Sequence, residues 1–376
     1  MMECVIFGRG RTARTVYKCL GLLEEYKLMY FVDSDVKNSG VKWEGVEFIT
    51  PEELIVKDIM KKMKVIIADE SRDEVYRQIL KLGYSEDDVI IADDIINKVF
   101  NKEYEKFLQK YEFIGENMRI TVNAPQIAED LEKADFEVLK YRVDKDDYDQ
   151  YLSQANYQVE YPEYIEEFKE SLPGKTFQHY VSYKLLDMKK DDVYMDVASS
   201  NSVFPYIAEK ICQVKTFKQD ISYKWGVNGN RIGSYASSIP MPDNSIDYMA
   251  LHCSLEHFEG NEDFLFIKEA HRLLSVKGKV CIIPLYLADE YVIMTSPKVW
   301  IDKYSVYIKA PEFDPRARIS INDSIRQRQS KHFSVQILKE ELLDKFSDKF
   351  NIKIYFIENF REFERAKPFV LVLEKI

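Results

Sequence analysis

Twice along the chain, a short apolar strand pattern is followed by a turn of small residues, a helix and a second strand that ends in an aspartate. The first occurrence covers residues 3–33 and the second covers residues 193–220. Strands that alternate with helices are typical of parallel sheets, because a parallel connection needs a long crossover. This repeated pattern predicts an α/β protein with two separate domains of the same general type.

Length, composition and charge restrict the class of protein further. The chain has 376 residues, enough for two domains, and 46% hydrophobic with 31% charged residues excludes a disordered or low-complexity protein. Lys and Arg total 53 against 64 Asp and Glu, which gives a formal charge of −11. An acidic surface disfavours binding to phosphate backbones, so we expect no nucleic-acid partner.

The cysteines and the N-terminal residues indicate the cellular compartment of the protein. The five cysteines are Cys4, Cys19, Cys212, Cys253 and Cys281. They form no CxxC pair, so we predict neither a disulfide framework nor a metal site. The start of the chain lacks a basic segment followed by a long apolar one, and no apolar run reaches about 18 residues. We therefore expect a cytoplasmic protein without membrane insertion; its oligomeric state is left open.

The first domain, residues 1–97, carries a glycine turn after its first strand. The candidate nucleotide site consists of Gly8, Arg9, Gly10, Arg11, Thr12 and Asp33. Glycines allow close approach to a phosphate, the following helix offers N–H donors, and an acid after the second strand suits a ribose hydroxyl. The same glycines also serve simple packing of helix on strand, so a ligand-free structural domain is equally compatible with the pattern.

After its second strand the first domain continues as Phe48-Ile49-Thr50-Pro51-Glu52-Glu53-Leu54. This stretch and the small size of the domain resemble the N-terminal Rossmann-type domain of sugar acetyltransferases of the PglD type, over residues 3–95. The resemblance implies a nucleotide-sugar ligand. A third interpretation, an NAD(P)-dependent oxidoreductase, lacks the Tyr-x-x-x-Lys residues that hydride transfer would need.

Residues 98–175 are predicted to connect the domains and are rich in tyrosine. Tyr148, Tyr151, Tyr157, Tyr161 and Tyr164 would either stack on a sugar or base, or cover hydrophobic surface between the domains.

In residues 176–376 a strand ends at Asp196, a small-residue loop follows, and the next strand is predicted over 214–219 and ends at Asp220. Further on, Ile239-Pro240-Met241-Pro242-Asp243-Asn244-Ser245-Ile246-Asp247 precedes another strand, and Lys277-Gly278-Lys279 leads into the next. This half of the chain resembles class I S-adenosylmethionine-dependent methyltransferases. The resemblance implies a seven-stranded mixed sheet and S-adenosylmethionine as the cofactor, with its methionine end at Asp196 and its ribose at Asp220. The residues assigned to the cofactor are Asp196, Ala198, Ser200, Asn201, Ser202, Asp220, Ile221, Ala236 and Ser237.

Two positions depart from that family. Its Asp-x-Gly-x-Gly-x-Gly loop is here Asp196-Val197-Ala198-Ser199-Ser200-Asn201-Ser202, without glycine. Since Ala and Ser adopt positive φ only at a cost, we expect a slightly different loop or a ligand further out, with Ser200, Asn201 and Ser202 donating to its carboxylate. Where many members have an acid for adenine, this chain has Tyr235-Ala236-Ser237.

Methyl transfer to a hydroxyl gains from a general base. His257 is the first candidate, because it follows the strand that faces the methyl group in this family, and His252 is the second. The alternative for either histidine is a structural role, in which its side chain packs in a loop.

A predicted cap insertion at about 286–334 is locally basic. Its proposed substrate residues are Arg316, Arg318, Arg326 and Arg328. Guanidinium groups suit an anionic acceptor such as a nucleotide-linked sugar, whereas a solvated face toward the acidic remainder of the protein is the alternative.

The methyltransferase pattern resembles enzymes of bacterial surface-polysaccharide or sugar biosynthesis, which implies a sugar, nucleotide-sugar or glycan acceptor. The alternative is a non-catalytic scaffold that binds a nucleotide sugar and carries a degenerate methyltransferase domain.

Overall fold

The computed structural model describes residues 1–111, 113–116, 120, 122–301, 308–325 and 327–376. The chain forms two compact units. The first unit contains residues 1–117, 295–311 and 321–328, and the second contains residues 118–294, 312–320 and 329–376.

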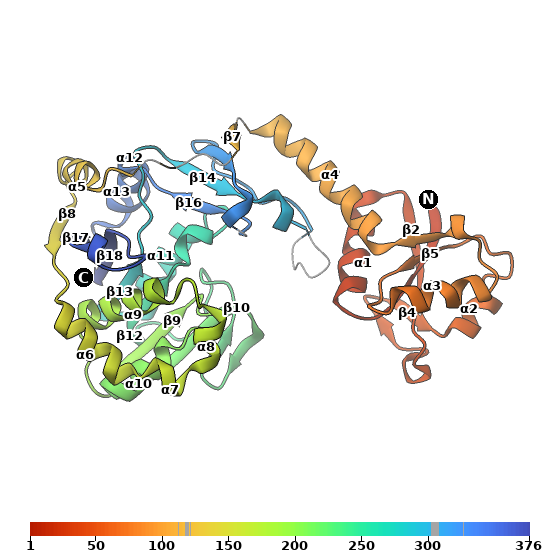
Figure 1. Cartoon of the computed structure of the whole chain (residues 1–376), viewed down its shortest axis with the longest axis horizontal. Coiled ribbons are helices and arrows are strands. Elements are labelled where there is room, and N and C mark those ends of the chain that lie inside the picture. Colours follow the sequence, from red (N-terminus) through yellow and green to blue (C-terminus); the bar gives the residue numbers. More distant parts are fainter. Residues whose placement is uncertain (112, 117–119, 121, 302–307, 326) are drawn as a thin grey trace. The chain divides into compact units, whose positions relative to one another are not determined.

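The first unit is built on a six-stranded sheet with the order β3-β4-β2-β1-β5-β6. Figure 1 draws this unit in red to orange, with β2, β4 and β5 labelled. Its strands are β1 (Met2–Phe7), β2 (Tyr26–Val32), β3 (Lys42–Trp43), β4 (Val46–Ile49), β5 (Lys64–Ile67) and β6 (Val89–Ile91). Its helices are α1 (Arg11–Leu23), η1 (Val36–Asn38), α2 (Pro51–Lys57), α3 (Arg72–Lys81), η2 (Glu86–Asp88) and α4 (Ala92–Lys110), and β7 (Phe113–Glu116) follows. Strands β4, β2, β1, β5 and β6 are parallel, as the alternating pattern predicts.

Two local features explain how this unit folds. Thr50 caps α2 by accepting from the Glu53 N–H (3.2 Å), while the Glu53 carboxylate accepts from the Thr50 N–H (2.7 Å). This reciprocal pair starts the helix directly after β4. Gly8 has φ +130°, and a Cβ at this position would lie 2.6 Å from the Ala68 carbonyl oxygen. Only glycine fits between β1 and the segment after β5.

The second unit is built on an eight-stranded sheet with the order β11-β10-β9-β12-β13-β18-β17-β8. Its strands are β8 (Glu137–Tyr141), β9 (Val193–Val197), β10 (Lys215–Asn228), β11 (Arg231–Gly233), β12 (Ile246–His252), β13 (Leu274–Ile283), β17 (Phe350–Ile357) and β18 (Phe369–Lys375). Its helices are α5 (Ala124–Lys133), α6 (Lys145–Ala155), α7 (Tyr157–Glu160), α8 (Pro162–Glu167), α9 (Leu172–Leu186), α10 (Phe204–Cys212), η3 (Leu255–His257), α11 (Glu262–Leu273), α12 (Val335–Leu338), the π-helical turn η6 (Lys339–Leu343), α13 (Asp344–Phe346) and η7 (Phe360–Glu362).

The directions of these strands identify the fold. β10, β9, β12 and β13 are parallel, whereas β18 runs antiparallel to both of its neighbours, β13 and β17. This is the class I methyltransferase fold, so the predicted α/β class with two Rossmann-like domains is confirmed. The sheet has eight strands instead of the predicted seven, because β8 adds to β17 in parallel.

Three sequence-based boundaries differ from the structure. The predicted connecting segment, 98–175, is not a separate part, since residues up to 117 belong to the first unit and the remainder, with β8, belongs to the second. The strand expected to end at Asp220 continues to Asn228 as β10. Residues 286–334 are shared between the units and form β14 (Val292–Thr295), η4 (Pro297–Val299), β15 (Arg318–Ile321), η5 (Asp323–Ile325) and β16 (Ser330–His332).

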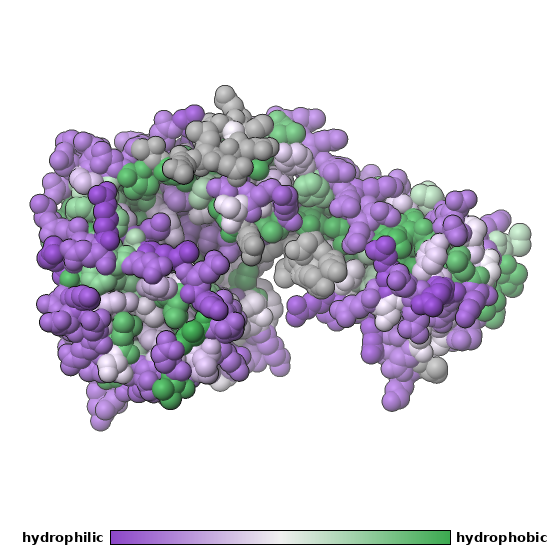
Figure 2. All heavy atoms as spheres, in the orientation of Figure 1, coloured by the Kyte–Doolittle hydropathy of each residue, from purple (hydrophilic) through white to green (hydrophobic). Residues whose placement is uncertain are grey.

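The tyrosines of the predicted connecting segment belong to the core. Tyr148, Tyr151, Tyr157 and Tyr164 are buried in one cluster of the second unit together with residues of α9 and α10, so they do not cover a boundary between domains. On the visible face of the molecule, hydrophilic side chains predominate over both units (Figure 2). Within the described ranges no helix combines the length and apolarity needed to cross a membrane.

Candidate functional site

A cavity of about 250 Å³ lies at the carboxyl ends of β9 and β12. The loop after β9 forms one wall, and α8, α9 and the residues after β12 form the others. In open α/β sheets, ligands bind outside the carboxyl ends of the strands where the strand order reverses, which here is between β9 and β12. The position of the cavity therefore agrees with a ligand site.

Three non-glycine residues that line this cavity have left-handed backbone conformations. The φ angles are 51° at Ala198, 43° at Ser200 and 52° at Cys253. Such conformations cost about 1–2 kcal/mol each for residues with a Cβ, and they are concentrated at functional sites. Ala198 and Ser200 occupy two of the positions where the methyltransferase family that the sequence resembles has glycine. The loop thus has positive φ angles at these two positions without glycine.

Asp196 supplies an unpartnered carboxylate oxygen to the same place. Its Oδ1 accepts from the Tyr194 hydroxyl (3.2 Å) and lies 3.2 Å from His252 Nδ1. Its Oδ2 is buried and has no hydrogen-bond partner among the described residues. A buried acceptor without a partner is costly, so this oxygen fits a ligand that brings a donor, such as an ammonium group.

Two buried histidines line the same cavity as Asp196. His252 lies with Nδ1 near Asp196 and Nε2 3.0 Å from the Ser182 hydroxyl, so both ring nitrogens are engaged. His179, on α9, lies with its ring 4.9 Å from that of His252 and with Nδ1 2.7 Å from the Tyr157 hydroxyl. Burial holds the pKa of His179 well below its usual range. Sequence reasoning missed His179, because nothing in the helical pattern of 172–186 distinguishes a cavity-lining histidine from a packed one.

Asp220, the predicted ribose ligand, lies beside the cavity loop. Its Oδ2 accepts from the Ser200 N–H (2.8 Å) and its Oδ1 from the Ser222 N–H (2.8 Å). A carboxylate has about four acceptor positions, so lone pairs remain for hydroxyl groups. Tyr223, from the unpredicted extension of β10, donates its hydroxyl hydrogen to the Ser200 carbonyl oxygen.

The other predicted cofactor residues have different surroundings. The Asn201 amide donates to Glu167 on α8, and the Ser202 carbonyl oxygen accepts from the buried Lys218 (2.7 Å). The Ser237 hydroxyl donates to Glu262, and Ala236 is buried. Ile221 is exposed. Next to Ala236, Tyr235 contacts Trp225 with the ring centroids 5.3 Å apart, and both rings are more than half exposed.

His257 does not line the cavity but lies close to it on η3. Its Nδ1 is 2.6 Å from the Gln329 carbonyl oxygen, and its Nε2 is 3.5 Å from Glu256 Oε1. A carbonyl oxygen only accepts, so Nδ1 carries a hydrogen. Burial raises the pKa of Glu256. The neighbouring residues Glu256 and His257 therefore interact through their side chains.

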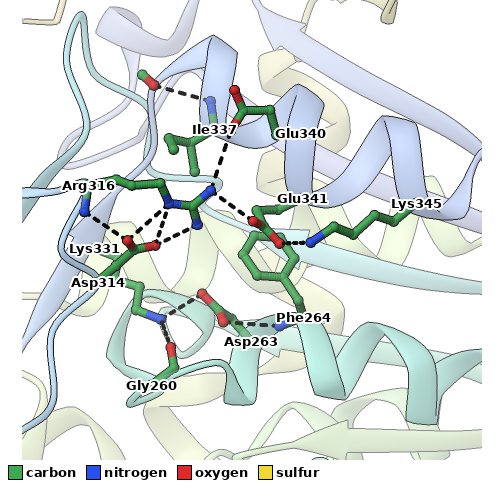
Figure 3. A network of polar contacts seen from close by, with 11 residues as sticks. Gly260, Asp263, Phe264, Asp314, Arg316, Lys331, Ile337, Glu340, Glu341 and Lys345 are labelled. Carbon is green, nitrogen blue, oxygen red and sulfur yellow. Dashed lines mark hydrogen bonds and ion pairs between the residues drawn. The ribbon is translucent and has the colours of Figure 1, made fainter.

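The predicted substrate arginines are engaged with their own surroundings. Arg316 contacts the carboxylates of Asp314, Glu340 and Glu341, as Figure 3 shows. Arg318 pairs with Glu290, and Arg328 donates to two carbonyl oxygens, those of Trp300 and Lys309. Arg326 lies outside the described residues. Arg316 and Arg318 thus have carboxylate partners within the second unit, and their role toward an anionic acceptor stays a prediction.

In the first unit, the predicted nucleotide residues meet at the ends of β1 and β2. Arg9 Nε lies 3.3 Å from Asp33 Oδ2, which also accepts from the Asn38 amide (2.9 Å). Gly10 precedes α1 as its N-cap residue, followed by Arg11 and Thr12 within the helix. The close approach of Gly8 to Ala68 gives this glycine a packing role, which is the structural alternative considered above.

In the described part of the chain, no group of three or more His, Cys, Asp or Glu side chains is placed so that it could hold a metal ion. The five cysteines are free thiols.

Comparison with known proteins gives one sequence family for part of the first unit and several solved structures. Residues 1–90 match the sequence family described as C2185-like, N-terminal. No curated protein sequence matches the chain.

Among solved structures, the chain is similar to 1,6-didemethyltoxoflavin-N1-methyltransferase of Burkholderia thailandensis, solved with 1,6-didemethyltoxoflavin and S-adenosylhomocysteine. The identity is 13%, the match covers 62% of this chain and 92% of that one, and the TM-score is 0.37. A SAM-dependent methyltransferase of Methanosarcina mazei is 16% identical over 50% of this chain and 94% of that one, with a TM-score of 0.30. A Pyrococcus horikoshii protein is 17% identical over 59% and 98%, with a TM-score of 0.32. The assignment of the fold rests on the strand order and directions described above.

Proposed function

We propose that the second unit is an S-adenosylmethionine-dependent methyltransferase. The observation that carries this proposal is the cavity at the ends of β9 and β12, where an unpartnered Asp196 oxygen meets a loop held in glycine-type conformations at Ala198 and Ser200. A protein that had lost its ligand would gain stability by relaxing these strained positions.

The residues present fit the proposed cofactor. Asp196 Oδ2 would accept from its ammonium group, the small-residue loop would approach its methionine end, and Asp220 would accept from ribose hydroxyls. The exposed ring of Tyr235 offers a stacking surface for adenine, in place of the acid found in many relatives. The cofactor, when bound, supplies a methyl group already activated on a sulfonium, so the protein has only to position an acceptor and exclude water.

We assign proton acceptance to His257 and a positioning role to His252. With the Nδ1 hydrogen of His257 directed at Gln329, its Nε2 is the nitrogen that can take up a proton, and Glu256 at 3.5 Å stabilises the imidazolium that forms. His252 has both ring nitrogens engaged and holds Asp196 in place.

The acceptor is proposed to be a hydroxyl of a sugar or glycan. The support for this step is the sequence resemblance to methyltransferases of polysaccharide and sugar biosynthesis.

The test is calorimetric titration of the full chain with S-adenosylmethionine and with S-adenosylhomocysteine. We expect binding of both, lost by at least tenfold in Asp196→Asn and in Asp220→Ala. Asp243→Asn, at an exposed aspartate outside the cavity, is the matched control and is expected to bind normally.

If the intact protein binds neither compound, the proposal fails. Binding of a nucleotide sugar such as UDP-glucose in that case would support the scaffold alternative, with Arg9 and Asp33 of the first unit as the residues to vary next.

A further inference from the structure

Buried polar atoms without partners are concentrated in one region of the molecule. Across the residues that the structure describes, five buried side-chain atoms lack a hydrogen-bond partner, and one of them is Asp196 Oδ2 of the cofactor cavity. The other four are Gln178 Oε1, Glu256 Oε2, Gln329 Oε1 and His332 Nδ1. Folded proteins contain few such atoms, and each one calls for a physical reason.

These four side chains, which we name the polar cluster, come from three parts of the second unit. Gln178 lies on α9, Glu256 on η3, and Gln329 and His332 at the start and end of the segment that forms β16. They are between 1% and 8% exposed. No single element explains their convergence, so the cluster is a product of the tertiary fold.

The polar cluster adjoins the cofactor cavity through Cys253. Gln178 Nε2 donates to the Cys253 sulfur (3.1 Å), and this sulfur lies 3.8 Å from the Tyr286 hydroxyl. The Tyr286 ring in turn contacts the His332 ring at 5.0 Å. Cys253 itself lines the cavity beside Asp196.

The contacts of Gln329 fix how its side chain is oriented. Its Nε2 donates to the Phe258 carbonyl oxygen (2.6 Å), so the other end of the amide, Oε1, is the acceptor left without a partner. The Gln329 main chain meanwhile accepts from His257. The segment at β16 therefore anchors the proposed proton acceptor and adds an unpartnered oxygen beside it.

The atoms of the polar cluster are mainly acceptors. Two amide oxygens and a carboxylate oxygen can bond only to O–H or N–H donors when Glu256 is ionised, and this carboxylate opposes an anion. The nearby cations lie against aromatic rings, Lys175 against Phe168 and Lys367 against Tyr286. This composition favours an uncharged ligand that carries several hydrogen-bond donors.

We propose that the polar cluster is the acceptor site of the methyltransferase, and that it binds an uncharged group rich in hydroxyl or amino donors rather than a phosphate. This inference rests on the proposed function and names the substrate class. In the transfer, an O–H or N–H bond of the acceptor breaks as its oxygen or nitrogen bonds to the methyl carbon. The methyl–sulfur electron pair stays on sulfur, and the proton passes to the Glu256–His257 pair.

Matched ligands test the substrate class. The full chain loaded with S-adenosylhomocysteine is titrated with small uncharged sugars and polyols, including methyl glucoside and N-acetylglucosamine, each beside its phosphate ester. We expect binding by uncharged members and at least tenfold weaker binding by their phosphate esters. Tighter binding of the phosphate esters overturns the proposal, and so does binding of no member when S-adenosylhomocysteine itself binds.

The variant Glu256→Gln keeps the size of the side chain and removes its charge. We expect it to weaken binding of the uncharged ligands at least tenfold while the affinity for S-adenosylhomocysteine stays within twofold. Glu340→Gln, the same change at an exposed pair with Arg316, is the control and should alter neither affinity. Equal effects of the two variants on the uncharged ligands would contradict the proposal.

A second measurement needs no acceptor. Buried polar groups that lack a partner until a ligand binds destabilise the ligand-free protein. The near-isosteric variants Gln178→Met and His332→Phe should therefore each raise the melting temperature of the free protein by about 2–4 °C. A fall in both variants would mean that these groups stabilise the core, and it would overturn the proposal. If the unmodified protein did not bind S-adenosylhomocysteine, that result would instead contradict the proposed function. The melting temperatures would still test whether the polar cluster is kept for a ligand.

Discussion

At the residue scale, the φ angles of Ala198 and Ser200 show what the loop without glycine does. Sequence alone suggests that a loop without glycine has a slightly different shape or that its ligand lies further out. In the structure both residues accept φ angles of 51° and 43°, and the Ser200 N–H is held by Asp220. The surrounding contacts therefore impose backbone conformations that glycine would adopt freely, at the expense of local strain.

Replacement of Ala198 by glycine should therefore be well tolerated. Relief of about 1–2 kcal/mol of strain offsets the roughly 0.5–1 kcal/mol entropic cost of glycine, so we expect an unfolding free energy within about 1 kcal/mol of the parent or above it. Ala208→Gly, inside α10, lacks this compensation and should lose about 1 kcal/mol or more. Urea unfolding measures both, and an equal loss in the two variants would show that Ala198 is not strained.

At the scale of elements, β16 is fixed to α11 by a buried ion pair. Lys331 Nζ lies 2.7 Å from Asp263 Oδ2, donates to the Gly260 carbonyl oxygen (2.8 Å), and is 2% exposed (Figure 3). Because β16 is flanked by Gln329 and ends at His332, this pair also positions two members of the polar cluster. A lysine in the locally basic insertion thus has a structural role that its charge alone did not reveal.

We expect Lys331→Met to destabilise the second unit by about 3–5 kcal/mol, because it leaves Asp263 buried without a counter-ion. The double variant Lys331→Met with Asp263→Leu should regain most of this loss. Thermal unfolding of the three proteins gives the comparison. A double variant as unstable as the single one would mean that the two side chains stabilise the fold by more than neutralising each other's charge.

The turn between β1 and α1 gives a second test at this scale. Gly8→Ala would place a Cβ 2.6 Å from the Ala68 carbonyl oxygen at φ +130°, so we expect a loss of about 2 kcal/mol or more in urea unfolding. Gly21, inside α1 with no atom near its missing Cβ, is the matched control. Gly21→Ala should stabilise by about 0.5–1 kcal/mol. Similar effects in both variants would argue against a close approach at Gly8.

At the scale of the whole molecule, the second unit encloses imidazoles that stay neutral. Burial lowers the pKa of His332 to about 4 from a model-peptide value of 6.5, with Lys367 and His257 adding to the effect. His179 is shifted in the same direction by burial and by His252. The unfolded chain therefore takes up protons at these positions before the folded chain does, which makes the fold less stable as pH falls.

For His332 this linkage has a definite window. Its contribution is complete above the unfolded pKa and is lost as pH falls from about 6.5 toward 4, at up to about 1.4 kcal/mol per pH unit. Between pH 7 and pH 5 the parent protein should lose about 2 kcal/mol that His332→Phe does not lose. Urea unfolding at the two pH values measures the difference. Parallel losses in both proteins would show that His332 titrates normally in the folded state.

The sequence by itself determined the fold class. The alternation of strands with helices and the aspartates at 196 and 220 are local signals, and the carboxyl ends of parallel strands meet at one edge of a sheet whatever the loops do. The closeness of Asp220 to the loop after β9 agrees with that rule, although β10 continues past Asp220. The eighth strand, β8, and the long β10 escaped prediction because edge pairing depends on partners distant in sequence.

Only the tertiary structure decided which polar groups face one another. Gln178, Glu256, Gln329 and His332 are separated by up to 154 residues in the sequence, and no local pattern joins them. The internal ion pairs of Arg316 and Arg318 are equally invisible in a charge count. Burial and hydrogen-bond satisfaction are properties of atoms packed together, so a linear pattern can name candidates for a site, but only the packed chain determines which of them lack a partner.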